Sequence, residues 1–167
     1  PDGDDKNLDR IRTRFRLGFV WKSLDESWEV GAGLATGGPE ATSTQDTWSE
    51  EEFFETGDIR LDYAYASHSL GALTFVAGQQ KNPFETSWLL WDSDVRPAGF
   101  TLQFEPGMFF VTLGGYAVIQ LEEEFGILYA AQLGTKIELD EIGVTLAAAY
   151  YDFDRDFESE YVREHDT

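Results

Sequence analysis

The chain has 167 residues, of which 12 are Lys or Arg and 32 are Asp or Glu, so its net charge at neutral pH is -20. Such a chain repels the phosphates of nucleic acids, and we expect no nucleic-acid partner. The absence of cysteine excludes disulfides, thiolate metal sites and cysteine nucleophiles. No run approaches the ~18 apolar residues of a transmembrane helix, which excludes a helical membrane protein.

Side chains alternate in character at every second position along most of the chain. In segment 10–21, four arginines lie on one face, and Ile11, Phe15, Leu17, Phe19 and Trp21 lie on the other. On a helix the arginines would spread around the circumference, so this period of two predicts a strand. Further strands are predicted at 28–35, 58–65, 72–80, 100–105, 108–120, 127–139 and 142–149.

The length of these segments bears on the kind of sheet they form. The pattern predicts about eight strands, most of roughly 9 to 14 residues, which is longer than the ~5–6 residues usual in soluble sheets. A transmembrane strand needs ~9–11 residues. We therefore predict an all-β protein, a transmembrane antiparallel β-barrel.

The connections between the predicted strands alternate in length. Short ones are expected at 23–27, 67–71, 105–107 and 140–141, long ones at 36–57 and 81–98, and one of medium length at 121–126. Outer-membrane barrels have short periplasmic turns and longer external loops, and the acidic residues gather in the longer connections here. Segments 1–9 and 152–167 are then external as well. Because both ends of such a barrel are normally periplasmic, we expect 1–167 to be an internal fragment of one barrel domain.

The small residues on the polar faces predict the size of that barrel. An eight-stranded barrel fills its interior with side chains, whereas ~16–18 strands leave an aqueous channel. Gly31, Gly33, Gly143 and Ala147 would leave voids in the former and would line water in the latter. We expect this chain not to close on itself and to belong to a barrel of roughly 16 strands.

Several stretches resemble the bacterial putative porin family. Segment 10–21 and the following Val-Gly-Ala-Gly-Leu-Ala-Thr-Gly at 30–37 are similar to two successive strands of that family, and 58–65 is similar to the next. Gly-Gln-Gln-Lys-Asn-Pro-Phe at 78–84 and Trp-Asp-Ser-Asp at 91–94 resemble its most recognisable stretch. The resemblance covers roughly residues 10 to 104. It implies an outer-membrane porin with many more strands than eight.

The charged face of two predicted strands is the candidate functional site. Charge on the lipid face would cost ~2–4 kcal/mol per residue at the midplane, so these side chains are expected to line the lumen. The predicted pore-lining residues are Arg10, Arg12, Arg14, Arg16, Asp58, Arg60 and Asp62. Alternatively, the arginines pair with acidic neighbours and hold the strands together. Neighbouring guanidiniums would stand ~6.5–7 Å apart, so their fields add and favour anions.

Aromatic residues give two further expectations. Six of them are expected on apolar faces or near strand ends, as an interfacial girdle: Trp21, Trp28, Tyr63, Tyr65, Tyr129 and Tyr150. In segment 82–98, Trp88, Leu89, Leu90 and Trp91 stand among charges. Exposed rings are unfavourable there, so we expect this segment to fold inward; the alternative is a patch that contacts a partner.

Catalytic chemistry finds little support in the sequence. His68 and His165 are isolated, with no spacing for a zinc site, and 152–156 lacks the Gly and Glu of a calcium loop. We expect no enzyme, metal or cofactor, and a passive channel for small hydrophilic solutes, anions among them, in the bacterial outer membrane. Its expected partners are outer-membrane lipid, these solutes and further copies of the chain. The alternatives are a surface barrel that binds a partner through its acidic loops, and a soluble barrel with apolar residues inward around a ligand.

Overall fold

The computed structural model describes residues 11–38, 43–48, 57–86, 91–92, 94–119, 125–140 and 142–154. The regular structure in these ranges consists of strands. The described residues contain no helix that is long and apolar enough to cross a membrane. The strands are β1 (Ile11–Thr13), β2 (Arg16–Lys22), β3 (Trp28–Thr36), β4 (Asp46–Trp48), β5 (Ile59–Leu70), β6 (Leu73–Gln79), β7 (Ala98–Phe104), β8 (Phe109–Ile119), β9 (Phe125–Leu139) and β10 (Ile142–Phe153).

Eight of the strands form one antiparallel sheet in the order β10-β9-β8-β7-β6-β5-β3-β2. Each strand of this sheet pairs with its neighbour in the chain, apart from the short β4, which pairs with β1 in a separate two-stranded sheet. The predicted all-β, antiparallel architecture is confirmed. The sheet is open, with β2 and β10 as its edges, so its closure into a barrel of roughly 16 strands stays a prediction.

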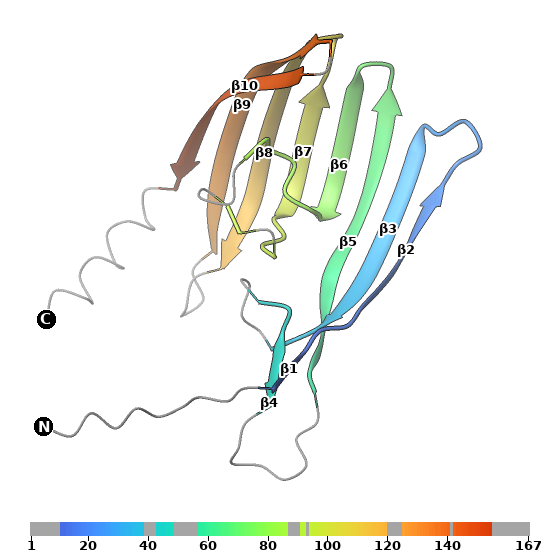
Figure 1. Ribbon diagram of the computed structural model, residues 1–167, viewed down its shortest axis with the longest axis vertical. Helices are drawn as coiled ribbons and strands as arrows, with labels where there is room; N and C mark the ends of the chain where they lie inside the picture. Colours follow the sequence, from blue (N-terminus) through green and yellow to red (C-terminus); the bar gives the residue numbers. More distant parts are fainter. Residues whose placement is uncertain are drawn as a thin grey trace, which may run out of the picture.

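The predicted alternation of short and long connections is confirmed for the long connections 37–58 and 80–97, whereas the connection at 120–124 is no longer than the β2–β3 turn at 23–27 (Figure 1). The turns β2–β3, β5–β6, β7–β8 and β9–β10 all lie at one end of the strands, the short-turn end, and the strand ends that border the other connections lie at the opposite, long-connection end. In the first turn Asp25 accepts hydrogen bonds from Ser23 and Ser27, which lower the pKa of its carboxyl to about 2. β10 extends to Phe153, so the predicted external segment 152–167 begins inside a strand, and its remainder from 155, like 1–9, lies outside the described residues.

The outer face of the sheet is apolar and exposed. Between 44% and 73% of the surface of each of the following side chains is exposed: Leu17, Phe19, Trp21, Phe75, Phe100, Phe104, Leu133, Leu146 and Tyr150. A soluble protein would bury such a face, whereas a membrane barrel turns it to lipid. The soluble-barrel alternative requires apolar residues inward, and the described strands have the opposite orientation.

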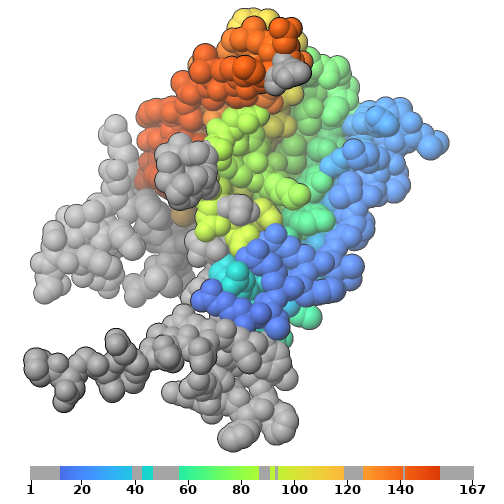
Figure 2. Space-filling view, in the orientation of Figure 1, coloured from blue at the N-terminus to red at the C-terminus, as the bar shows by residue number. Residues whose placement is uncertain are grey.

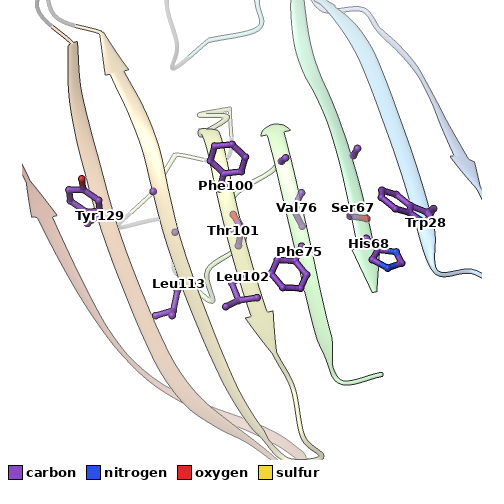
Figure 3. A pocket seen from close by; sticks show the side chains of 14 residues that line it. Trp28, Ser67, His68, Phe75, Val76, Phe100, Thr101, Leu102, Leu113 and Tyr129 are labelled. Atoms are coloured by element: carbon purple, nitrogen blue, oxygen red, sulfur yellow. The ribbon is translucent and has the colours of Figure 1, made fainter. Parts of the chain in front are cut away.

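The same outer face has a shallow apolar hollow of about 530 Å³ near Trp28, Phe75, Phe100 and Tyr129 (Figure 3). Beside it the rings of Trp28 and His68 stack, with centroids 4.3 Å apart. The hollow is part of the apolar outer face, which a membrane barrel turns to lipid. Trp21, Trp28, Tyr129 and Tyr150 lie on this face with about half or more of their surface exposed, as predicted for four of the six girdle aromatics.

The predicted continuous strand at 10–21 is wrong. β1 and β2 are separated at Arg14 and Phe15, and β1 leaves the large sheet to pair with β4. The backbone N–H of Phe15 donates to Thr36 Oγ1 at 3.0 Å, and the N–H of Thr36 donates to Phe15 O. These bonds satisfy the backbone N–H and C=O groups of Phe15 at the break. Arg12 and Arg14 donate to side-chain acceptors outside the large sheet, which stabilises them away from a regular strand.

A register shift between β3 and β5 reverses part of the predicted pattern. Gly33 pairs with Tyr63 but Leu34 pairs with Leu61, so Asp62 is an extra residue, a β-bulge. Tyr63 and Tyr65 therefore lie on the inner face, and their predicted place in an apolar girdle is wrong. Tyr65 donates its hydroxyl hydrogen to Glu29 Oε1 at 2.6 Å. Its ring covers Gly31, which lines no water, contrary to expectation.

Gly33→Val should therefore destabilise the sheet by about 1–3 kcal/mol, the usual range for overpacking. A Cβ at Gly33 would stand 2.5 Å from Tyr63 Cε1, so the tyrosine ring must move. Gly143→Val is the matched control, because a Cβ there meets nothing within 4 Å and valine suits a strand. Urea unfolding of both variants in detergent measures the difference. Equal midpoints would contradict the close packing of Tyr63 on Gly33.

Candidate functional site

The connection between β6 and β7, residues 80–97, folds inward against the sheet, as predicted, where the structure describes it. We call it the inward loop; residues 80–86, 91–92 and 94–97 of it are described. The sheet is curved, and Figure 2 shows the loop, in light green and yellow-green, between β10 in orange and β2 in blue. The loop therefore crosses the inner face from one side of the sheet to the other.

An aromatic contact attaches the first half of the loop to β8 and β10. Phe84 is 6% exposed and meets Tyr116 edge-to-face at a centroid distance of 6.1 Å. It meets Tyr151 in the same manner at 5.8 Å. Trp91, from the second half of the loop, also stacks on Tyr151. Edge-to-face pairs of this kind add to the free energy gained by burial, so Phe84 is the apolar anchor of the loop.

Polar contacts attach the same part of the loop to β9. The backbone N–H of Glu85 donates to Gln132 Oε1, and Gln132 Nε2 donates back to Glu85 O, both at 2.8 Å. Lys136 Nζ lies 2.8 Å from Glu85 Oε1. Because Gln132 is buried, its two reciprocal bonds leave no polar atom of its amide unsatisfied and fix the height of the loop above the sheet.

A cluster of charges attaches the other end of the loop to β2 and β5. It consists of Arg14, Arg16, Asp62, Asp94 and Arg96. Asp94 accepts from Nη2 of Arg16 at 2.6 Å and from Nη2 of Arg14 at 3.1 Å. Arg96 Nε donates to Asp62 Oδ1 at 3.0 Å, and Arg16 Nε lies 3.8 Å from the other oxygen of Asp62. The carboxylates of Asp62 and Asp94 are both buried. Asp62 pairs with Arg96 of the loop, and Asp94 pairs with Arg14 and Arg16.

The ionisation of Asp94 follows from these contacts. Burial opposes its charge, but the hydrogen bond from Arg16, the charges of Arg14 and Arg16 and the N–H of Thr44 act more strongly and hold the pKa of Asp94 below its ordinary value. Asp94 is thus ionised at neutral pH. With three guanidiniums and two carboxylates, the charge cluster keeps one net positive charge.

The structure brings together three of the seven predicted site residues, namely Arg14, Arg16 and Asp62. Arg12 lies apart and donates to Gln45 Oε1 at 3.0 Å, and Arg60 donates to Gly38 O at 3.2 Å. Asp58 is exposed directly before β5, and Arg10 lies outside the described residues. The alternative that the arginines form ion pairs is correct for Arg14 and Arg16, although Asp94 comes from the loop. Their role in lining a pore stays a prediction.

Two charged residues of the site were not predicted. Asp94 was expected in an outward acidic loop, and this is wrong, because it is 7% exposed beneath two arginines. Arg96 carried no expectation, yet its side chain is buried against Asp62. The only sequence signal for both was their position shortly after Trp91, in or next to the stretch that resembles the family. Asp92, in the same connection, is exposed and accepts a hydrogen bond from the backbone N–H of Asp94 at 2.8 Å. The acidic groups at 50–55 and 122–124 lie outside the described residues.

Comparison with known proteins assigns a family to this arrangement. No curated protein matches the chain. The sequence pattern of the family described as "Putative porin" matches residues 2–160, almost the whole chain. An antiparallel sheet with an apolar outer face, a polar inner face and alternating connections agrees with that match. The chain belongs to the putative porin family.

Proposed function

We propose that the chain forms part of the wall of an outer-membrane β-barrel of about 16 strands, a passive channel for small hydrophilic solutes without a chemical step. The observation that carries this proposal is the inward loop, which is attached to β2, β5, β8, β9 and β10 across a polar inner face. In a closed barrel such a loop narrows the passage without filling it. The free edges of β2 and β10 would pair with the strands that complete the barrel.

The charge cluster would then lie at the narrowest part of the passage. The side chains of Arg14 and Arg16 remain 43% and 35% exposed despite their pairing with Asp94. Their outer surfaces face the space that solutes would cross. The net positive charge of the cluster supports a preference for anions, which is weaker than four unpaired arginines would produce because Asp62 and Asp94 cancel most of the field.

Reconstitution in planar bilayers tests the proposal. The full-length protein, purified in detergent, is expected to insert and to give discrete conductance steps in KCl, and liposomes that contain it should release small sugars but retain dextrans. A protein that stays monomeric in buffer without detergent, or that inserts without conducting, would reject the channel in favour of another role for the barrel.

Replacing Arg12 and Arg14 together by Gln should move the zero-current potential in a KCl gradient toward cation preference. The substitution removes two positive charges, Arg14 of the cluster and Arg12 of β1, while Arg16 continues to hold Asp94. Lys22→Gln is the control, because Lys22 is paired with Glu29 beside the β2–β3 turn. An unchanged potential with conductance intact would mean that these arginines serve packing alone.

A further inference from the structure

A small polar cavity lies between the wall of the sheet and the two ends of the inward loop. Its volume is about 200 Å³, and its polar lining consists of Arg16, Asp62, Tyr63, Lys81 and Arg96. Arg16 comes from β2, Asp62 and Tyr63 come from the bulge of β5, and Lys81 and Arg96 come from the beginning and the end of the loop. The cavity therefore exists only while the loop is folded inward.

Several hydrogen-bond donors of this cavity are unused. Lys81 is exposed and makes no ion pair or hydrogen bond with the part of the chain that the structure describes. Within the described residues Arg16 hydrogen-bonds through Nη2, to Asp94 and Thr44, and its Nε faces Asp62 at 3.8 Å, which leaves the N–H groups of Nη1. The Tyr63 hydroxyl has no hydrogen bond within the described ranges and lies over Gly18, where a Cβ would collide with it.

The charge of the lining is positive. Three cationic side chains stand around one carboxylate, that of Asp62, which Arg96 already holds at 3.0 Å and Arg16 approaches at 3.8 Å. Donors without acceptors next to a surplus of positive charge are the arrangement that binds an oxyanion, because charge-assisted bonds to it satisfy donors that water would otherwise satisfy. The cavity exceeds the ~30 Å³ share of one water several times, so a carboxylate or phosphate group fits.

We propose that this cavity is a binding site for the oxyanion group of a permeating solute, with Lys81, Tyr63 and Arg16 as its donors. The proposal rests on the channel function above and adds a class of solute to it: small molecules that carry a carboxylate or a phosphate. Lys81 supplies a charge that no carboxylate among the described residues neutralises, and the Tyr63 hydroxyl supplies a directional bond. Gly18 permits the tyrosine to lie where it does.

Conductance in solutions of increasing acetate, and separately of inorganic phosphate, tests the site in the full-length protein. A binding site predicts that conductance saturates as the anion concentration rises, whereas conductance in KCl remains close to linear. Saturation by acetate but not by phosphate would assign the site to carboxylates, and the reverse result would assign it to phosphates. A conductance that rises linearly with both anions would overturn the proposal while leaving the channel in place; no conductance in any salt would instead reject the channel.

Two variants localise the binding. Lys81→Gln should raise the half-saturating concentration about tenfold or more, since hydrogen bonds to charged groups contribute ~1.5–3 kcal/mol. Tyr63→Phe should raise it severalfold by removing the hydroxyl alone. Lys22→Gln is the matched control, because it removes a lysine of the inner face that pairs with Glu29 and does not line the cavity. Half-saturation that is unchanged in Lys81→Gln, or raised equally in Lys22→Gln, would overturn the assignment to this cavity.

Discussion

Asp94→Ala is expected to release the far end of the inward loop and to raise the single-channel conductance. The substitution removes the acceptor that joins the loop to Arg14 and Arg16. Hydrogen bonds between charged groups contribute ~1.5–3 kcal/mol, and because both arginines are a third or more exposed we expect a loss near the lower end, about 2 kcal/mol. The loss of one negative charge beside Arg14 and Arg16 should also increase the preference for anions.

Conductance and zero-current potential, recorded together in a KCl gradient, check both effects. Asp58→Ala is the control, because it removes an exposed carboxylate directly before β5 without touching the inward loop. If Asp94→Ala conducts like the wild type with the same selectivity, Asp94 does not hold the loop.

The pH dependence of the same contact has a definite sign. A carboxyl whose pKa is lowered in the folded state stabilises the fold at any pH above its ordinary value and loses that contribution as the pH falls through the lowered value. The loop should therefore stay closed from neutral pH down to the ordinary aspartate pKa and open only in stronger acid. Asp94→Asn should lack this acid transition, and a transition of equal size in that variant would assign it to other groups.

Phe84→Ala is expected to detach the opposite end of the loop. The ring is buried between Tyr116 and Tyr151, and truncation of a buried Phe usually costs ~3–5 kcal/mol. A loss of ~3 kcal/mol in the closed loop raises its open population on the order of a hundredfold. Trypsin cleavage after Lys81 should accelerate by a similar factor where cleavage is slow relative to reclosing.

Phe100→Ala serves as the matched control, because that ring is 73% exposed on the outer face and does not contact the loop. Cleavage of Phe84→Ala at the wild-type rate would show that the polar contacts of Glu85 with Gln132 and Lys136 hold this end of the loop by themselves.

Local pattern alone determined the architecture of this chain. Each strand of the large sheet pairs with a strand next to it in the chain, except where β4 intervenes, so the period of two and the spacing of the turns were sufficient to predict the antiparallel order. They also predicted which face is apolar on most strands, because one face must accept lipid or a core along the whole strand. The inward fold of the described part of segment 82–98 was predicted from its apolar residues, of which Trp91 is described and Trp88, Leu89 and Leu90 lie outside the described residues.

The tertiary structure alone decided how the site is assembled. One extra residue at Asp62 shifts the register and turns Tyr63 and Tyr65 inward, and a one-residue bulge leaves almost no trace in an alternating sequence. The break at Arg14 and Phe15 likewise depends on partners in other segments. Asp94 meets Arg14 across a separation of 80 residues, and an acidic residue in a long connection looks the same in the sequence whether water or an arginine neutralises it. Only the closure of the loop over the sheet distinguishes the two, because burial makes the ion pair necessary.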